Sequence, residues 1–317
     1  MDRPRPAFAL ALLLGLVGCG ERGEVVVFHA ASLSQPFTEV AEAYRELRPQ
    51  TVVRLEPSGS LVAARKVAEL GLRADLVAVA DATILDRMLL PAKADFAVEI
   101  ATNEIVLAHL DHSRFTDEVS GESWPEVLAR PDVRLGCADP ALAPIGYHTL
   151  VAWQLCDRSP GGDLVARLRA RCPRDRLVPD ETELVALLES RAVDYAFLYR
   201  STAEDHRLKI TALPASCNLS RRELAASYAT ASVDVAPAGA APVRRAGAPI
   251  VYAVTIPRDA PHPDEARRFL AFLLGERGRA ALARRGLAPL VPAPAHGAAL
   301  PQEVGALVTW AGRDSPR

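Results

Sequence analysis

The chain has no surplus of positive charge and few aromatic residues. Lys and Arg number 37 against 39 Asp and Glu, which gives a formal net charge of −2 at pH 7. Because binding to a phosphate backbone depends on excess cations, this balance argues against a nucleic-acid partner. A composition of 50% hydrophobic, 24% charged and 5% aromatic residues excludes collagen-like, coiled-coil and wholly disordered classes.

Two catalytic or metal-binding spacings are missing from the sequence. No Cys-x-x-Cys pair occurs, so neither a zinc site nor a thiol redox motif is indicated. No Gly-x-Ser-x-Gly segment occurs either, and Ser58-Gly59-Ser60 does not replace it. A secreted hydrolase therefore stays a remote alternative, and we expect that the protein is not an enzyme.

The N-terminal apolar run, residues 7–17, is too short to span a bilayer. Two arginines precede it and Leu-Val-Gly-Cys19 ends it, a pattern typical of a secretory signal. The ending resembles the bacterial lipobox, so we expect a signal peptide over 1–18, acylation of Cys19 and a tether over 19–23. This predicts a periplasmic or outer-face location with a lipid anchor. An ordinary signal with a chance cysteine is the alternative.

Four cysteines remain in this potentially oxidising setting. Cys156 and Cys172 fall near the ends of two successive helical segments, which favours their pairing. Buried free thiols are an equal alternative, and spacing alone does not choose among the pairings. The other two cysteines are Cys137 and Cys217.

Short apolar runs alternate with helical patterns along the chain, which predicts an α/β protein with largely parallel strands. The length suggests two domains at about 150 residues each. We expect strands at 25–28, 52–55, 74–80, 105–108, 133–137, 195–199 and 249–254, and helices at 33–47, 61–70, 146–155, 163–172, 181–190 and 264–274. The Ala- and Pro-rich stretch 229–249 is predicted to be a long surface connection.

Four loops share one pattern, in which a strand is followed by a turn and the start of a helix. They are residues 30–33, 58–61, 140–147 and 179–184. Each would present free backbone N–H groups at the carboxyl end of a strand, where α/β proteins bind ligands. Together they suit a small anion. The alternative is structural: serines as N-caps, Asp180 with Glu183 as a capping box, and Tyr199 in the core.

Several segments, in consistent order, resemble the substrate-binding lipoproteins of molybdate/tungstate ABC importers. They are residues 27–34, 58–60, 64–67, 101–108, 130–134, 194–197, 249–252 and 300–301. The resemblance implies a type II periplasmic-binding fold, with two α/β lobes joined by two crossing strands. It places lobe 1 at 24–105 and 253–317, and lobe 2 at 106–252.

The same resemblance implies which residues bind the anion. Ser32 and Ser60 correspond to hydroxyl and amide donors of the first lobe, and Tyr199 to a hydroxyl donor of the second. Ile145 and Glu181 correspond to backbone N–H donors, with the Glu181 carboxylate directed away from the anion. The expected ligand is molybdate or tungstate, without a cofactor. The expected partner is an ABC permease, and the protein is expected to be a monomer.

The chain departs from the family pattern at two positions. The branch that it resembles most has carboxylates there, linked to a six-coordinate metal centre. This chain has Ala143 and Leu198, which cannot ligate a metal. We therefore expect no metal ligation by side chains and an intact tetrahedral anion held by hydrogen bonds.

Two further ligands are alternatives. Sulfate or phosphate could occupy the same scaffold, since cavity size and donor count decide selectivity. A cation could be bound by His109, Asp111 and His112, although their spacing suits one face of neither a helix nor a strand.

Overall fold

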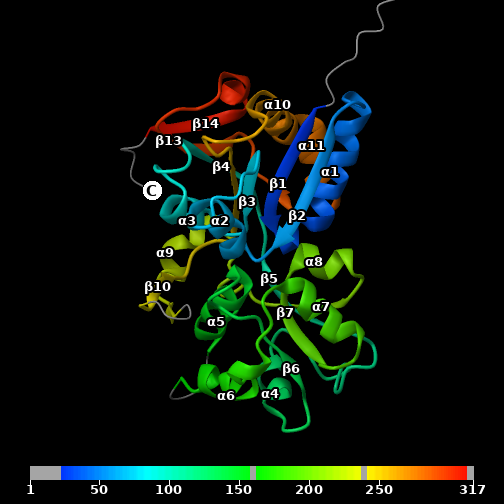
Figure 1. The fold of residues 1–317 in the computed structure, drawn as a ribbon. Helices are drawn as coiled ribbons and strands as arrows, with labels where there is room; N and C mark the ends of the chain where they lie inside the picture. Colours follow the sequence, from blue (N-terminus) through cyan, green and yellow to red (C-terminus); the bar gives the residue numbers. More distant parts are fainter. Residues whose placement is uncertain (1–22, 158–161, 237–240, 313–317) are drawn as a thin grey trace, which may run out of the picture.

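Two α/β lobes, each built on its own sheet, follow one another along the long axis of the molecule (Figure 1). The computed structural model describes residues 23–157, 162–236 and 241–312. The predicted signal sequence and Cys19 lie outside the described residues. Within them, no helix has the length and apolar character needed to cross a membrane.

The sheet of lobe 1 is mixed rather than largely parallel, which corrects the sequence-based prediction. Its strand order is β14-β13-β4-β11-β3-β1-β2, with β12 beside β4. β1 pairs in parallel with β2 and β3, whereas β11 is antiparallel to both β3 and β4. The bounds are β1 Glu24–Ala30, β2 Val52–Ser58, β3 Leu76–Val79, β4 Phe96–Thr102, β11 Val251–Thr255, β12 Ala288–Pro289, β13 Ala293–Gly297 and β14 Val308–Gly312.

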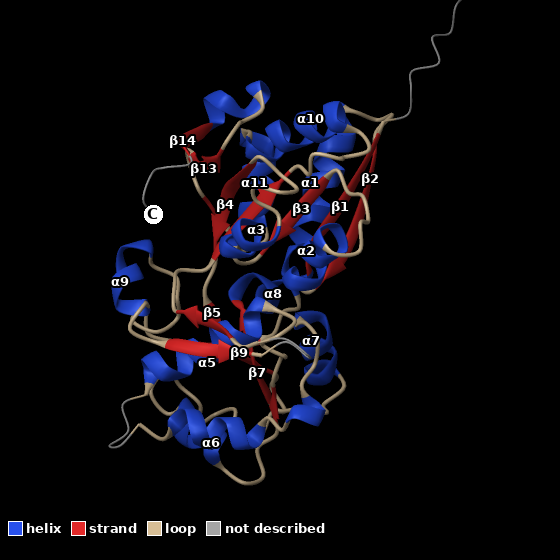
Figure 2. Ribbon diagram, turned by 60° about the vertical axis from the view of Figure 1, so that its left-hand side comes forward, coloured by secondary structure: helices blue, strands red, loops and turns tan. Residues whose placement is uncertain are grey.

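Helices cover both faces of this sheet, which explains why β1 is almost continuously apolar. Val25 and Val27 belong to one core cluster with residues of α1 and α10, while Phe28 belongs to a second cluster with residues of α2 and α3. These two pairs of helices lie on opposite faces of the sheet (Figure 2). Asp81 caps α3, accepting a hydrogen bond from Thr83 N at 2.9 Å. The helices of this lobe are α1 Ser34–Leu47, α2 Ser60–Ala68, α3 Ala82–Met88, α10 Pro263–Leu274 and α11 Glu276–Arg284.

Lobe 2 has a smaller sheet in the order β6-β7-β5-β8. β6 pairs in parallel with β7, and β5 is antiparallel to β7 and β8. The strands are β5 Ile105–His109, β6 Leu135–Gly136, β7 Tyr195–Tyr199 and β8 Lys209–Ala212, and the helices are α4 Trp124–Ala129, α5 Pro144–Cys156, α6 Leu164–Arg171, α7 Glu181–Glu189, α8 Arg200–Asp205 and α9 Ala225–Tyr228. Short 3₁₀ segments span Ala31–Leu33, Arg174–Arg176, Arg222–Leu224 and Gln302–Leu307.

The chain crosses between the two sheets twice. The first crossing leads from β4 into β5 and the second into β11. Asn103 N donates to Ile250 O at 3.3 Å, so the two crossings lie side by side. The exact division of the chain into lobes stays a prediction.

The stretch 229–249 is not a plain connection, so that expectation was wrong. It contains β9 Ser232–Val235 and β10 Val243–Ala246, which pair antiparallel. The Gln154 side chain of α5 donates to Ser232 O at 2.9 Å and accepts from Ser232 N at 3.0 Å. Val233 and Val235 are buried, so alternating valines form a strand within an Ala- and Pro-rich composition.

The cysteines pair differently from the favoured prediction. Cys137 is bonded to Cys172 and Cys156 to Cys217, with Cα atoms 5.9 and 5.4 Å apart. The Cys156–Cys172 pairing and the free-thiol alternative are therefore wrong. α6 ends beside the segment that follows β6, whereas α5 ends near the loop after β8, so successive helix ends do not meet.

Candidate functional site

A small pocket between the lobes is lined by residues of both. Lobe 1 contributes Ala30, Ala31, Ser32, Gly59, Ser60 and Ala80, and lobe 2 contributes Ala143, Pro144, Ile145, Asp180, Glu181 and Tyr199. All the predicted anion-binding residues are thus brought together. Ala143 also lines the pocket, whereas Leu198 does not. No Lys or Arg is among the described residues that line it.

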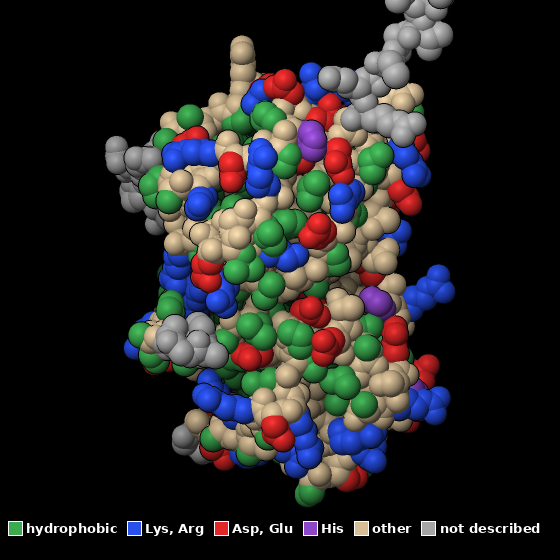
Figure 3. Space-filling model, in the orientation of Figure 1, with side chains coloured by type: hydrophobic (Ala, Val, Ile, Leu, Met, Phe, Trp, Pro, Cys, Tyr) green, Lys and Arg blue, Asp and Glu red, His purple; other side chains and the backbone are tan. Residues whose placement is uncertain are grey.

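The lobes approach each other closely beside this pocket. A Cβ atom at Gly59 would lie only 2.6 Å from the carbonyl oxygen of Leu142 in the other lobe. Glycine therefore allows the loop before α2 to contact the loop before α5. On the face seen in Figure 3, acidic and basic side chains are interspersed over both lobes, in agreement with the near-neutral net charge.

The predicted loops bring helix starts to the pocket. α2 begins at Ser60, α5 at Pro144 and α7 at Glu181, and the segment after β1 begins with a 3₁₀ turn. The first N–H groups of a helix have no acceptor within the helix, and the helix dipole makes this end positive. The lining therefore offers several backbone donors to an anion.

The two serines are not N-caps in this structure. Gly59 caps α2 and Leu33 caps α1, neither with a side-chain hydrogen bond. Instead, the Ser60 hydroxyl accepts from Ala80 N at 3.0 Å, and the Ser32 hydroxyl accepts from the Tyr252 hydroxyl at 2.9 Å. Each serine oxygen is thus held by a protein donor, which leaves the serine proton for another acceptor.

Tyr199 is held by a residue that the sequence interpretation missed. Its hydroxyl lies 2.9 Å from Nδ1 of His148, and both side chains are buried. Burial lowers the pKa of His148 to about 4, so the imidazole is neutral at pH 7. Burial also raises the pKa of Tyr199 well above its usual value, so Tyr199 keeps its proton. The only sequence signal for His148 is a polar residue within an apolar helix.

The Glu181 carboxyl is buried at the back of the site, only 3% exposed. Its Oε1 accepts a hydrogen bond from Tyr199 N at 2.7 Å. Burial, the largest cause, raises the pKa of Glu181 to about 8. The carboxyl is therefore directed toward the end of β7, and at pH 7 it is mostly protonated.

A buried polar cluster joins the crossing segments to the site. Nδ2 of Asn103 donates to Ser201 Oγ at 2.7 Å and to the Tyr252 hydroxyl at 3.3 Å. Tyr252 in turn donates to Ser32, so the crossings and the first serine are connected. The connection of Asn103 and Tyr252 to the site was not predicted, because no local pattern relates residues so distant in sequence.

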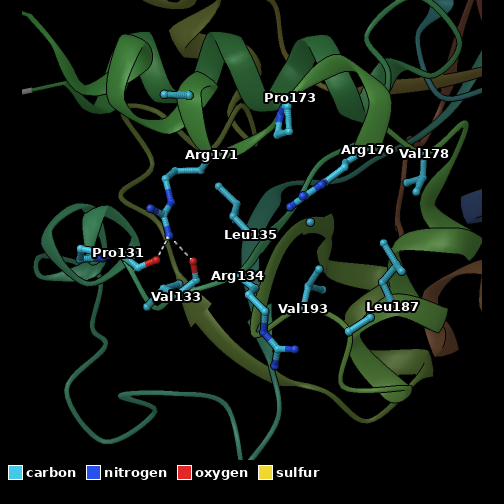
Figure 4. A pocket seen from close by; sticks show the side chains of 13 residues that line it. Pro131, Val133, Arg134, Leu135, Arg171, Pro173, Arg176, Val178, Leu187 and Val193 are labelled. Atoms are coloured by element: carbon cyan, nitrogen blue, oxygen red, sulfur yellow. Dashed lines mark hydrogen bonds between the residues drawn. The ribbon is translucent and has the colours of Figure 1, made fainter.

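A larger cavity in lobe 2 does not bring the predicted residues together (Figure 4). Arg134, on its wall, forms a salt bridge with Asp194, with Nε 3.2 Å from Oδ2. Arg171 donates to backbone carbonyls, including that of Pro131 at 2.7 Å (Figure 4). Both arginines therefore already bind groups of lobe 2 itself.

The residues proposed for a cation site do not form one. The His109 ring contacts the hydroxyls of Thr116 and Thr211 at 3.0 and 3.2 Å. Asp111 forms an ion pair with Lys209 at 2.7 Å. Across 23–157, 162–236 and 241–312, no group of three or more His, Cys, Asp or Glu side chains is arranged to hold a metal ion.

The family model of bacterial extracellular solute-binding proteins matches residues 25–288. The chain belongs to this family. It is 36% identical over 330 aligned residues to the molybdate/tungstate-binding protein WtpA of Pyrococcus abyssi, covering 94% of this chain and 95% of that protein. The resemblance inferred from the sequence is thereby confirmed, and the related proteins are solute-binding proteins rather than enzymes.

Solved structures confirm the predicted fold of two α/β lobes. The periplasmic molybdate-binding protein of Azotobacter vinelandii gives a TM-score of 0.56 at 16% identity, over 83% of this chain and 98% of that one. The sulfate-binding protein SubI of Mycobacterium tuberculosis gives a TM-score of 0.63 at 14% identity, over 84% of this chain and 87% of that one. At these identities the likeness concerns the fold alone.

Proposed function

We propose that this solute-binding protein captures molybdate or tungstate between its lobes and delivers the anion to an ABC permease. The observation that carries the proposal is the pocket itself, where helix starts from both lobes and two serine hydroxyls of lobe 1 meet without a lining cation. The 36% identical relative named for molybdate and tungstate supports this ligand class. Ser32, Ser60, Tyr199 and the N–H groups of Ile145 and Glu181 are the proposed donors.

Neutral donors are sufficient for such a ligand. A hydrogen bond to a charged group contributes about 1.5–3 kcal/mol, and a helix end adds about 0.3–1 kcal/mol. Although these contributions are not additive, several donors together stabilise a doubly charged anion. A fully deprotonated tetrahedral oxyanion accepts from all of them, since none of its oxygens needs an acceptor.

We further propose that the anion stays tetrahedral. The Ala143 side chain offers no ligand atom on the pocket wall, and Leu198 is fully buried in the lobe 2 core. X-ray absorption at the metal edge of the bound complex should therefore show four oxygen neighbours. Two additional protein oxygens around the metal would contradict this geometry.

The lobe bounds, the lipid anchor and the monomeric state belong to the same proposal. Lobe 1 comprises 24–105 and 253–317, lobe 2 comprises 106–252, and acylated Cys19 holds the protein at the outer face of a bacterial membrane. Radiolabelled palmitate should label the wild type expressed in bacteria but not Cys19→Ala. Label retained by Cys19→Ala would contradict the anchor.

Titration calorimetry with molybdate, tungstate, sulfate and phosphate tests the ligand. We expect one anion per chain and the tightest binding for molybdate or tungstate. Sulfate is the second candidate because it is also a fully deprotonated tetrahedral dianion, so that cavity size and donor count decide between the ligands. Tighter binding of sulfate than of either metal oxyanion would replace our choice.

A further inference from the structure

The Glu181 side chain occupies an unusual place for an acid in a proposed anion site. Its backbone N–H begins α7, while its carboxyl is buried behind the same pocket. Tyr199 N donates to Oε1 at 2.7 Å. The hydroxyls of Ser32 and Thr202 face the same carboxyl from the loop after β1 and from α8. Carboxyl and anion would therefore share one small, water-poor space.

We propose that Glu181 is a specificity residue that must carry a proton for the anion to bind. The inference rests on the proposed function, because it concerns the same pocket. A carboxylate beside a dianion would place two negative groups in a low-dielectric space without a lining cation, which is strongly unfavourable. The neutral acid removes this repulsion.

Protonation of Glu181 also determines what the Ser32 proton does. The Ser32 oxygen accepts from the Tyr252 hydroxyl, so its remaining donor is its own proton. A Glu181 carboxylate would attract that proton and compete with the anion. A Glu181 carboxylic acid can instead donate to the second lone pair of Ser32, which leaves the serine proton for the ligand.

The surroundings of Glu181 favour the neutral acid. Burial raises the pKa of Glu181 to about 8, and the nearby Asp180 carboxylate acts in the same direction, whereas the Tyr199 N–H, Thr202 and Ser32 lower it. The other titratable groups that face it are Tyr199 and Tyr252, whose pKa values are raised by burial, so both stay neutral. A bound dianion would raise the pKa of Glu181 further.

This arrangement would exclude oxyanions that carry a proton. With Glu181 neutral and its proton directed to Ser32, the serine hydroxyls and helix starts all act as donors. Hydrogenphosphate brings a proton of its own and needs an acceptor, a role that an ionised Glu181 carboxylate could fill and the protonated acid, whose proton is directed to Ser32, fills less well. The protonated acid therefore favours fully deprotonated tetrahedral dianions.

Calorimetric titrations of molybdate and sulfate from pH 6.5 to 9.5 test the inference, in two buffers of different ionisation enthalpy. For the wild type we expect a nearly constant Kd up to about pH 8 and, above it, roughly tenfold weaker binding per pH unit with uptake of one proton. The Kd of Glu181→Gln should not change with pH over this range. The matched control Glu183→Gln, two residues along on an exposed position of α7, should follow the wild-type curve.

The outcomes separate the two proposals. A Kd that does not change with pH in the wild type overturns the role of Glu181 and leaves the proposed function standing. The same holds if the Kd of Glu181→Gln rises above pH 8 as steeply as that of the wild type. If the wild type binds sulfate with the expected pH dependence of Kd but does not bind molybdate or tungstate, the proposed function is overturned and the role of Glu181 is supported. Difference infrared spectra make the test independent of the variant's affinity. They should show a carboxylic acid C=O band that titrates near pH 8 in the wild type, and a wild type without such a band would contradict the inference.

Discussion

The hydroxyl of Tyr147 donates a 2.5 Å hydrogen bond to Oδ2 of Asp81, which ties α5 of lobe 2 to the start of α3 in lobe 1. The other oxygen of Asp81 caps α3 through Thr83 N. The Arg245 guanidinium lies over the Tyr147 ring, 5.3 Å from its centroid, and its buried Nε and Nη1 have no partner among the described residues. The arrangement in which the two lobes contact each other, here called the closed form, thus includes a hydrogen bond between them beside the pocket.

Tyr147→Phe should weaken anion binding about tenfold. The closed form would lose a hydrogen bond to a charged group, which contributes about 1.5–3 kcal/mol, and about 1.4 kcal/mol corresponds to one factor of ten. Calorimetry gives the affinity, and small-angle scattering should show a larger radius of gyration for the unliganded variant.

Tyr195→Phe is the matched control for this variant. The Tyr195 hydroxyl donates to Arg114 O at 2.5 Å, and both residues belong to lobe 2. Its loss should lower the melting temperature without changing the affinity. Equal affinities for Tyr147→Phe and the wild type would show that the interlobe hydrogen bond does not stabilise the closed form.

Removing the Ser32 and Ser60 hydroxyls together should weaken binding at least about 100-fold, because two hydrogen bonds to a charged ligand are lost. The fold should be nearly unchanged, since Ala80 N and the Tyr252 hydroxyl lose only one acceptor each. Calorimetry and circular dichroism of Ser32→Ala/Ser60→Ala test both statements. The exposed Ser190→Ala serves as the control, and wild-type affinity in the double variant would exclude these serines as ligands.

The parts of the site that follow local rules were predictable from sequence. An apolar strand followed by a small-residue turn and a helix start describes both Ser32 and Ser60, and the structure places both at the pocket. Their detailed role was not predictable, because neither serine is the helix cap that its position suggests.

The contacts that could not be predicted connect residues distant in sequence. His148 meets Tyr199 across 51 residues, and Asn103 meets Tyr252 across 149. Such pairs depend on how lobes and crossings are placed, for which periodicity gives no signal. The disulfide pairing was not predicted for the same reason. β9 and β10 were missed because the Ala- and Pro-rich composition around them concealed two strands of only four residues each.

The disulfides should stabilise lobe 2 specifically, since all four cysteines belong to it. They close segments with separations of 35 and 61 residues, for which the chain-entropy model gives about 4 kcal/mol each. Alanine replacement of either pair should lower the free energy of unfolding by a similar amount. Peptide mapping without reduction should recover Cys137 with Cys172 and Cys156 with Cys217. A peptide linking Cys156 to Cys172 would contradict the structure.

Stability should vary with pH in a way that identifies Glu181. Its pKa is raised from 4.5 to about 8, so the folded state holds this proton more tightly than the unfolded chain does. The resulting contribution to the free energy of unfolding is complete below pH 4.5 and is lost as the pH rises to about 8. His29 and His148 act oppositely, since burial lowers each pKa from 6.5 to about 4. Their contribution is present above pH 6.5 and is lost on acidification.

These three groups together place maximal stability near pH 6.5. Between that pH and 8, the free energy of unfolding should decline by up to about 1.4 kcal/mol per pH unit. Glu181→Gln cannot ionise, so its stability should stay level over this interval, while Glu183→Gln should decline with the wild type. Urea unfolding at half-unit pH steps measures the free energy of unfolding of the wild type and of both variants. Parallel curves for Glu181→Gln and the wild type would mean that Glu181 is already ionised in the folded protein at neutral pH.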